Sequence, residues 1–325
     1  MKALKADVFL LVCFLAIKVA FPRDLNPVLV YDVTVMQNGF PQSGLNYRIP
    51  VVAIGPLNGT LVVVLEQRLG GTSDGVPKNI AYKYSEDNGI TWSPISTIFE
   101  SPDSGKIFMG NLIVDAEKGS ILVIFTACSK DCPGNKWSNY VSKSLDDGRT
   151  WSKPVNISSQ IGAFEYCGGP SLGVQKRYPP NKGRLIACGH TEPILVDGVY
   201  CVFSDDHGDN WTLGKPHLGI PFEQDKVEGD YLPDEVTMVE LPNGDLMVNA
   251  RNQGSFLNHF HCPCRMTMIS KDGGETFPTE FVRINEDLPD PACAAGLALF
   301  DNKTLLFTNP NNANNRVDMT LSVVH

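Results

Sequence analysis

The chain has 325 residues, of which 42% are hydrophobic and 19% are charged. This composition excludes an intrinsically disordered protein and supplies enough apolar residues for one large domain or two ordinary ones. A net charge of -9 at pH 7, without a run of lysines or arginines, argues against a nucleic-acid partner held through phosphate contacts.

The first twenty residues are predicted to be a secretory signal peptide. Lys2 and Lys5 precede an apolar run at residues 8–17, and a small residue, Ala20, follows. A membrane-spanning helix needs about 18 apolar residues or more, and this run is roughly half as long. We therefore expect residues 1–20 to be removed and residues 21–325 to form the mature domain.

Other features also fit passage through a secretory compartment. Nine cysteines are present and eight follow residue 20, so disulfides are expected in an oxidising lumen, with their pairing open. Around Cys262 and Cys264, the Cys-x-Cys spacing favours a disulfide-bearing strand or loop over a zinc site with His259 and His261. No metal or cofactor is expected. Four sequons are candidate glycosylation sites: Asn58, Asn156, Asn210 and Asn302.

An internal repeat sets the expected architecture. The pattern Ser-x-Asp-x-Gly-x-x-Trp/Phe starts at residues 85, 144, 204 and 270, as SEDNGITW, SLDDGRTW, SDDHGDNW and SKDGGETF. Ser and Asp side chains can bind the backbone of a tight turn, Gly supplies a positive φ, and the aromatic ring packs beneath. Each copy therefore predicts a stapled hairpin at a blade rim, and we interpret all four as purely structural.

Short strands are expected around the repeats, at residues 60–65, 121–125, 184–187 and 245–249. No long stretch keeps the 3.6-residue period of a helix. One hairpin for about every 60 residues predicts an all-β fold, a β-propeller in which each period is one four-stranded blade.

A second set of residues resembles the sialidase family. Tyr47 opens a Tyr-Arg-Ile-Pro segment like the family's Arg-Ile-Pro signature, and the repeat itself resembles the Asp box of sialidases, which also occurs in sorting receptors and glucanases. The segments GRLIACGH, FSDDHGDNW and NARNQ are most similar to the lysosomal neuraminidases of animals, in glycoside hydrolase family 33. The matching site positions, in chain order, are Arg48, Arg68, Asp74, Glu235, Arg251 and Arg316.

The resemblance implies an exo-α-sialidase that removes terminal α-linked sialic acids from oligosaccharides, glycoproteins and gangliosides with retention. Arg48, Arg251 and Arg316 would supply bidentate donors to the sugar carboxylate. The alternative for each arginine is an ion pair at the surface. Arg68 would contact sugar hydroxyl groups.

The two acids are expected to carry proton transfer. Asp74 would be the general acid and later the base, although a simple turn residue beside Gly75 is the alternative. Glu235 would act as the base of a tyrosine nucleophile, and otherwise it is a solvated acid at a strand edge.

The family pattern breaks at the end of the chain. A sialidase propeller has six blades with the tyrosine downstream of the third arginine, but nine residues follow Arg316 and none is a tyrosine. About 305 mature residues at about 60 per blade make about five blades. We expect the last blade of the six-bladed β-propeller to be missing or incomplete, a strand edge to be exposed, and activity to be reduced or absent.

Two other functions stay open at this point. One is a non-catalytic Asp-box propeller that binds sialylated glycans, and the other is a glycosidase of different sugar specificity. The resemblance further implies a lysosomal location, with membrane association or the cell surface as variants. It also implies partnership with cathepsin A and β-galactosidase.

Overall fold

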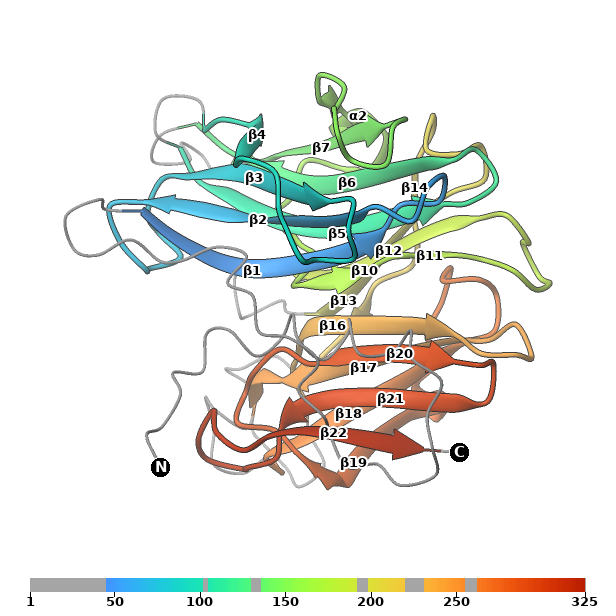
Figure 1. Cartoon of the computed structure of the whole chain (residues 1–325). Helices are drawn as coiled ribbons and strands as arrows, with labels where there is room; N and C mark the ends of the chain where they lie inside the picture. The colour runs from blue at the N-terminus through green and yellow to red at the C-terminus, as the bar shows by residue number, and fades with distance from the viewer. Residues whose placement is uncertain are drawn as a thin grey trace.

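The computed structural model describes residues 45–101, 105–129, 136–191, 198–219, 231–254 and 262–324. Within them the chain forms five β-sheets, called blades 1 to 5, which follow one another around the molecule in chain order (Figure 1). The helical segments α2 (Ser158–Ile161) and η5 (Thr279–Phe281) are single turns. The all-β propeller expected from the repeat is confirmed. The predicted signal peptide lies outside the described residues.

Within each blade the strands follow one another from the inside of the propeller outward. Blade 1 holds β1 (Leu45–Ile54), β2 (Leu61–Leu69), β3 (Lys78–Ser85) and β4 (Ser96–Phe99), and blade 2 holds β5 (Ile107–Asp115), β6 (Ser120–Ala127), β7 (Ser138–Ser144) and β8 (Val155–Asn156). Blade 3 holds β11 (Val174–Gln175), β12 (Leu185–Thr191), β13 (Gly198–Ser204) and β14 (Thr212–Leu213), with β9 (Tyr166–Cys167) and β15 (His217–Leu218) at its sides. Blade 4 holds β16 (Pro233–Glu240), β17 (Leu246–Asn252), β18 (Cys264–Ser270) and β19 (Val282–Pro289), and blade 5 holds β20 (Gly296–Phe300), β21 (Thr304–Pro310) and β22 (Met319–Val324).

The strands predicted from the sequence overlap the second strands of blades 1 to 4, and three of the four predicted ranges start one residue before the observed strand. Each observed strand runs two to four residues beyond the predicted end, as in β17, which ends at Asn252. A short strand, β10 (Ser171–Leu172), pairs in parallel with β5 and so joins blade 3 to blade 2.

The apolar core lies between neighbouring blades. On β6, which is buried throughout, Val123 and Phe125 pack with blade 1, while Leu122 and Ile124 pack with blade 3. Successive side chains of a strand point to opposite faces of its sheet, so one continuous apolar strand serves two interfaces. A third cluster fills the space between blades 3 and 4.

The innermost strands face a common axis. A cavity of about 90 Å³ is lined by residues of β1, β16 and β20 together with β10 and its neighbour Pro170. Because these strands come from three blades and a blade-to-blade link, the cavity marks the centre of the propeller.

The antiparallel order divides the molecule into two rims. In each blade the turns after the first and third strands lie at one edge, called the box rim because the Asp boxes form the turns after the third strands. The starts of the first strands, the ends of the second strands and the loops that follow them lie at the other edge, called the loop rim.

The Asp boxes have the geometry that the motif predicts. In the first box the Gly89 amide donates to Ser85 Oγ at 2.8 Å, and Ser85 Oγ donates to Asp87 at 2.8 Å. The Trp92 ring nitrogen donates to the Gly89 carbonyl at 3.0 Å. Asn88 has a φ of 60° and Gly89 of 90°, which explains why Gly follows a residue that tolerates the left-handed region.

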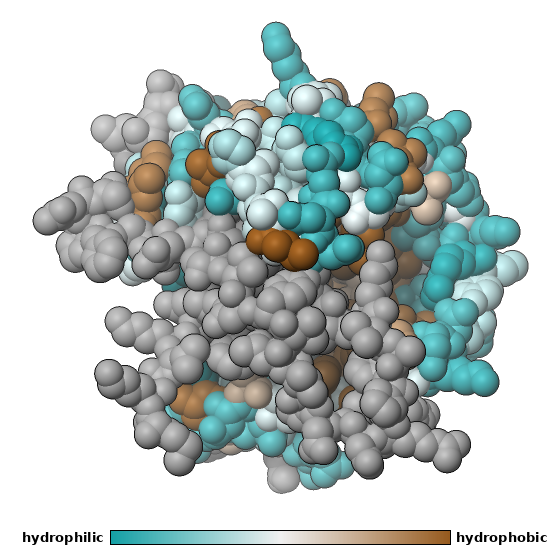
Figure 2. Space-filling model, viewed as in Figure 1, coloured by the Kyte–Doolittle hydropathy of each residue, from teal (hydrophilic) through white to brown (hydrophobic). Residues whose placement is uncertain are grey.

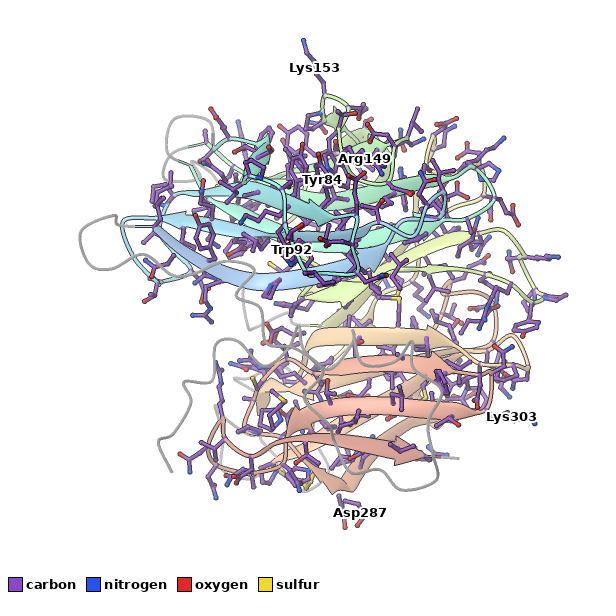
Figure 3. All side chains as sticks on the ribbon, in the orientation of Figure 1. Tyr84, Trp92, Arg149, Lys153, Asp287 and Lys303 are labelled. Carbon is purple, nitrogen blue, oxygen red and sulfur yellow. A yellow bond between two sulfur atoms is a disulfide. The ribbon has the colours of Figure 1, made fainter. Side chains whose placement is uncertain are left out.

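Box residues also tie each blade to the preceding one. Asp147 accepts the backbone amides of Leu57 and Asn58 at 3.0 and 2.6 Å. Arg149 donates to Glu86 at 2.6 Å, and its guanidinium lies 6.0 Å from the Tyr84 ring, beside which it is drawn in Figure 3. These contacts join blade 2 to blade 1 at the box rim.

The surface in the view of Figure 2 is mainly polar, with apolar residues in small separate groups. Large apolar side chains are exposed on several blades, and in blade 5 Met319 and Leu321 of the outermost strand β22 are 42% and 47% exposed. The described residues form three strands in this blade, which is compatible with the expected incomplete end of the propeller; a sixth blade stays a prediction. No described helix is long and apolar enough to cross a membrane.

Candidate functional site

Bulges in the first strands shape the loop rim. Residues 49–50 of β1, 110–111 of β5 and 234–235 of β16 each place two residues opposite one on the neighbouring strand. Such bulges bend a strand and redirect its side chains, and they are common beside active sites. Ile49 has a φ of 56°, a strained value for a β-branched residue.

Arg68, at the end of β2, and Asp74, in the loop that follows, form one half of the candidate site. The Arg68 side chain is fully buried, and its guanidinium donates to Asp74 Oδ1 at 2.5 Å and to Glu66 Oε2 at 2.9 Å. The Asp74 side chain is 73% exposed. An exposed carboxyl held by a buried arginine is accessible to a ligand and keeps a fixed direction.

Glu66 organises this half of the site from below. Its carboxylate also lies 3.2 Å from the Lys78 ammonium and accepts the Met109 amide of blade 2 at 3.2 Å. Burial lowers the pKa of Lys78, and the attraction of Glu66 opposes that decrease. Sequence reasoning passed over Glu66, although an acid within the apolar run of β2 was the available signal.

Arg251 and Glu235 form the other half, in blade 4. Arg251 Nη1 donates to Glu235 Oε2 at 2.8 Å, and its Nε lies 3.7 Å from Asp234 Oδ2. Burial lowers the pKa of Arg251, but the charges of Asp234 and Glu235 outweigh this effect and raise it overall. The guanidinium therefore stays charged in a partly buried position, as binding of an anion requires.

Asp234 is the buried acid of this half. Burial raises its pKa, but the nearby His190 and Arg251 outweigh this effect and lower the pKa overall. Its Oδ1 lies 3.2 Å from His190 Nε2 and accepts the Glu235 amide at 2.6 Å. Asp234 thus fixes both the Glu235 backbone and the Arg251 side chain.

Arg316 approaches the same half from the loop between β21 and β22. Its Nη2 donates to the Ala292 carbonyl at 2.8 Å. The next residue, Cys293, is a free thiol whose pKa burial raises, while the charges of Arg316 and Arg251 oppose the increase and that of Glu235 adds to it. Arg316 therefore bonds to the residue next to Cys293, and Arg316, Arg251 and Glu235 all act electrostatically on the Cys293 thiol.

Arg48 lies at the loop rim but apart from these contacts. It is exposed beside the β1 bulge, and its backbone pairs with Glu66 across β1 and β2. The backbone therefore brings Arg48 to the rim of the Arg68 and Asp74 half.

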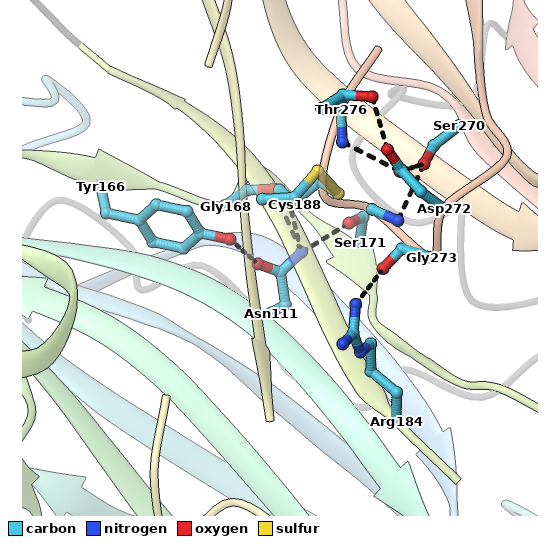
Figure 4. Close-up of a disulfide and its surroundings, with 12 residues drawn as sticks. Asn111, Tyr166, Gly168, Ser171, Arg184, Cys188, Ser270, Asp272, Gly273 and Thr276 are labelled. Atoms are coloured by element: carbon cyan, nitrogen blue, oxygen red, sulfur yellow. Dashed lines mark hydrogen bonds between the residues drawn. A yellow bond between two sulfur atoms is a disulfide. The ribbon is translucent and has the colours of Figure 1, made fainter. Parts of the chain in front are cut away.

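Residues of blade 2 and the glycines Gly168 and Gly169 lie between the two halves of the candidate site. Asn111, in the β5 bulge, donates to the Gly168 carbonyl at 3.4 Å and to Ser171 at 2.8 Å, and it accepts the Tyr166 hydroxyl at 2.9 Å (Figure 4). A Cβ on Gly169 would lie 3.2 Å from Glu235 Cβ. This close packing between blades 2 and 4 requires residues without side chains.

The predicted sequons and cysteines can now be placed. Cys188–Cys201 and Cys262–Cys264 are disulfides, so a disulfide rather than a metal occupies the Cys-x-Cys pair. The described residues hold no cluster of three metal-ligating side chains, and His259 and His261 lie outside them. All four sequon asparagines, Asn58, Asn156, Asn210 and Asn302, are exposed, and their glycosylation stays a prediction.

A model of the BNR repeat-like domain matches residues 59–325 of the chain. The chain belongs to this family. This BNR repeat-like chain is 28% identical over 281 residues to a sialidase of Micromonospora viridifaciens, covering 80% of the chain and 39% of the relative. It is 25% identical over 312 residues to a sialidase of Bacteroides fragilis, covering 85% of the chain and 52% of the relative.

A solved structure has the same fold. The Hadza microbial sialidase Hz136 matches with a TM-score of 0.69 at 23% identity, over 86% of the BNR repeat-like chain and 56% of that protein. The chain thus spans about half or less of the length of these relatives. The two relatives are sialidases, and the structural likeness shows the fold alone. These comparisons do not distinguish the animal lysosomal type.

Proposed function

We propose that the protein is an exo-α-sialidase that releases terminal α-linked sialic acid from oligosaccharides, glycoproteins and gangliosides with retention. The observation that carries the proposal is the direct contact of Arg251 with Glu235 at the loop rim, together with Arg316, which bonds to the Ala292 carbonyl beside Cys293. Two guanidinium groups near one glutamate form an anion site beside a base. This arrangement suits a sugar that carries its own carboxylate.

The proposed chemistry assigns a step to each half of the site. The sialic acid carboxylate would bind Arg251 and Arg316, with Arg48 as the third donor. Asp74 would protonate the leaving glycosidic oxygen, and its exposure leaves room for the aglycone on that side. Arg68 holds the Asp74 carboxyl in place and would also contact sugar hydroxyl groups.

Glu235 would act as the base for the nucleophile. Its carboxylate is paired with Arg251 and is one-fifth exposed, so it is held in place and remains accessible. In a sialidase the nucleophile is a tyrosine, whose phenol a neighbouring glutamate deprotonates. We expect this chain to bind sialosides through its arginines and to protonate the leaving group through Asp74.

Hydrolysis of a fluorogenic α-sialoside at acidic pH tests the proposal. We expect slow release of sialic acid that Asp74→Asn lowers at least tenfold, since general acid–base catalysis contributes roughly 10²–10⁴. The matched control is Asp287→Asn, because Asp287 is exposed on β19, the outermost strand of blade 4 (Figure 3). The first sugar released should be the α-anomer by NMR.

Two results would contradict the enzyme proposal. Equal rates for the wild type and Asp74→Asn would remove the acid from the mechanism. Binding of sialosides without any release would instead favour a non-catalytic Asp-box propeller that recognises sialylated glycans.

We further propose a lysosomal location reached through the secretory pathway, with association at the membrane or the cell surface. We also propose cathepsin A and β-galactosidase as partners. Both proposals rest on the resemblance to lysosomal neuraminidases. Co-purification of the tagged chain from lysosomes with the two proteins tests them.

A further inference from the structure

One strand position that recurs between blades at the loop rim has no role yet in the candidate site. The penultimate residue of the second strand is Arg68 in blade 1 and Arg251 in blade 4, and both belong to the candidate site. In blade 3 the same position of β12 is His190. Counted from the residue that pairs with the serine of the Asp box, His190 and Arg251 both lie five residues further along the second strand, so the repeat brings His190 to the same level as Arg251.

His190 contacts the site through one ring nitrogen. Its Nε2 lies 3.2 Å from Asp234 Oδ1, and the other oxygen of that carboxylate lies 3.7 Å from Arg251 Nε. A carboxylate has no proton to donate, so this contact is favourable when Nε2 carries a proton. His190, Asp234 and Arg251 thus form a chain of contacts that ends at Glu235.

The other ring nitrogen of His190 makes no such polar contact. His190 is 6% exposed, and its Nδ1 is buried without a hydrogen-bond partner. Burying an unpaired ring nitrogen costs stability. A residue kept only for packing at this position would more simply be apolar, so the polar contact with Asp234 is the feature that accounts for a histidine.

The backbone around His190 is built for close approach. A Cβ on the preceding Gly189 would lie 2.4 Å from the Cys167 carbonyl oxygen, and one on Gly169 would lie 3.2 Å from Glu235 Cβ. The segment from Cys167 to Gly169 is therefore packed between β12 and Glu235. A small displacement of the His190 ring would reach the site through either Asp234 or this segment.

We propose that His190 is a positioning residue of the sialic acid site, which holds Asp234 and through it sets the direction of Arg251 and Glu235. This inference rests on the proposed function, because it assigns His190 to the same site. His190 itself touches neither the sugar nor the reacting atoms. Its effect passes through the Asp234 carboxylate.

Calorimetric titration of the full chain with methyl α-sialoside tests the inference with three substitutions. Glutamine can place an amide N–H near the position of Nε2, whereas asparagine and alanine cannot reach Asp234. We expect His190→Ala and His190→Asn to weaken binding about tenfold, and His190→Gln to stay within about threefold of the wild type. The Asn variant retains the test if the Ala variant does not fold.

The matched control is His217→Gln in the same blade. His217 is similarly buried, but its nitrogens bond to the Phe277 carbonyl and the Tyr231 hydroxyl at 2.8 and 2.9 Å. We expect this variant to bind the sialoside like the wild type, whatever its melting temperature.

The outcomes separate this inference from the proposed function. Wild-type binding that Arg251→Lys abolishes and His190→Asn leaves unchanged would overturn the role of His190 and leave the sialic acid site intact. Equal weakening by His190→Gln and His190→Asn would overturn the positioning contact. No binding by the wild type would overturn both.

Discussion

At the scale of single residues, the arginines of the candidate site are held in place by buried acids. Glu66 fixes Arg68, and Asp234 fixes Arg251. Each acid offsets the cost of burying an arginine, and of the two arginines Arg251 keeps part of its side chain exposed. The residues that would contact the sugar therefore depend on residues one layer below.

Glu66→Gln tests this dependence. The substitution leaves Arg68 and Lys78 buried without their counter-charge, so we expect a loss of about 3 kcal/mol in the free energy of unfolding. It should also weaken binding of methyl α-sialoside, because Asp74 and Arg68 lose their fixed geometry. Urea denaturation and calorimetric titration measure the two effects.

Glu240→Gln is the matched control at the box rim. Glu240 is buried and lies 3.0 Å from the Lys176 ammonium, so its loss should destabilise the chain to a similar extent. Sialoside binding should nevertheless persist in the folded protein. If both variants bind equally well, Glu66 has no role in the site.

At the scale of elements, the Asp box acts as a charged staple. In the third box the Asn210 amide and side chain and the Ser204 hydroxyl all donate to Asp206, at 2.7–2.8 Å. Burial raises the pKa of Asp206, but these hydrogen bonds outweigh it and lower the pKa to about 2. The ionised carboxylate is thus part of the turn.

The depressed pKa predicts how stability depends on pH. An unfolded aspartate has a pKa of 3.8, so the folded carboxylate of Asp206 stabilises the protein above about pH 4. This contribution is lost as the pH falls from about 4 towards 2. Asp206→Asn should lower the melting temperature by about 2–4 °C at pH 6 and by progressively less at lower pH.

Thermal melts from pH 6 to pH 2.5 measure this difference. Asp287→Asn serves as the control, since Asp287 is exposed on β19 and belongs to no box. A difference that stayed constant over the whole pH range would show that ionisation of Asp206 does not contribute to the staple.

At the scale of the whole molecule, the sequence predicted the repeat but not how the blades are joined. The four boxes fixed the propeller and the rim on which each staple lies, because Ser, Asp and Gly at this spacing act locally. In blade 3 the place of the inner strand is shared by β9 and β11, which both pair with β12. This arrangement and the parallel pairing of β10 with β5 depend on packing between distant segments. A local pattern contains no signal for them.

The candidate site was likewise predicted in part from the sequence. The family resemblance pointed to Arg68, Asp74, Arg251 and Glu235, each with its own role, and those roles stay predictions. The structure adds that Arg68 contacts Asp74 and that Arg251 contacts Glu235. His190 was passed over because its role follows from a strand position shared between blades. That equivalence becomes visible only when the register of the second strands is known.

The central claim is that the loop rim recognises the carboxylate of a sialic acid. Calorimetric titration with methyl α-sialoside and with its methyl ester tests it most directly, because the two ligands differ in the charge that the arginines would bind. We predict measurable binding of the acid and at least about tenfold weaker binding of the ester, as expected for loss of a charge-assisted bidentate contact. Equal affinity for the two ligands, or no binding of the acid, would contradict the claim.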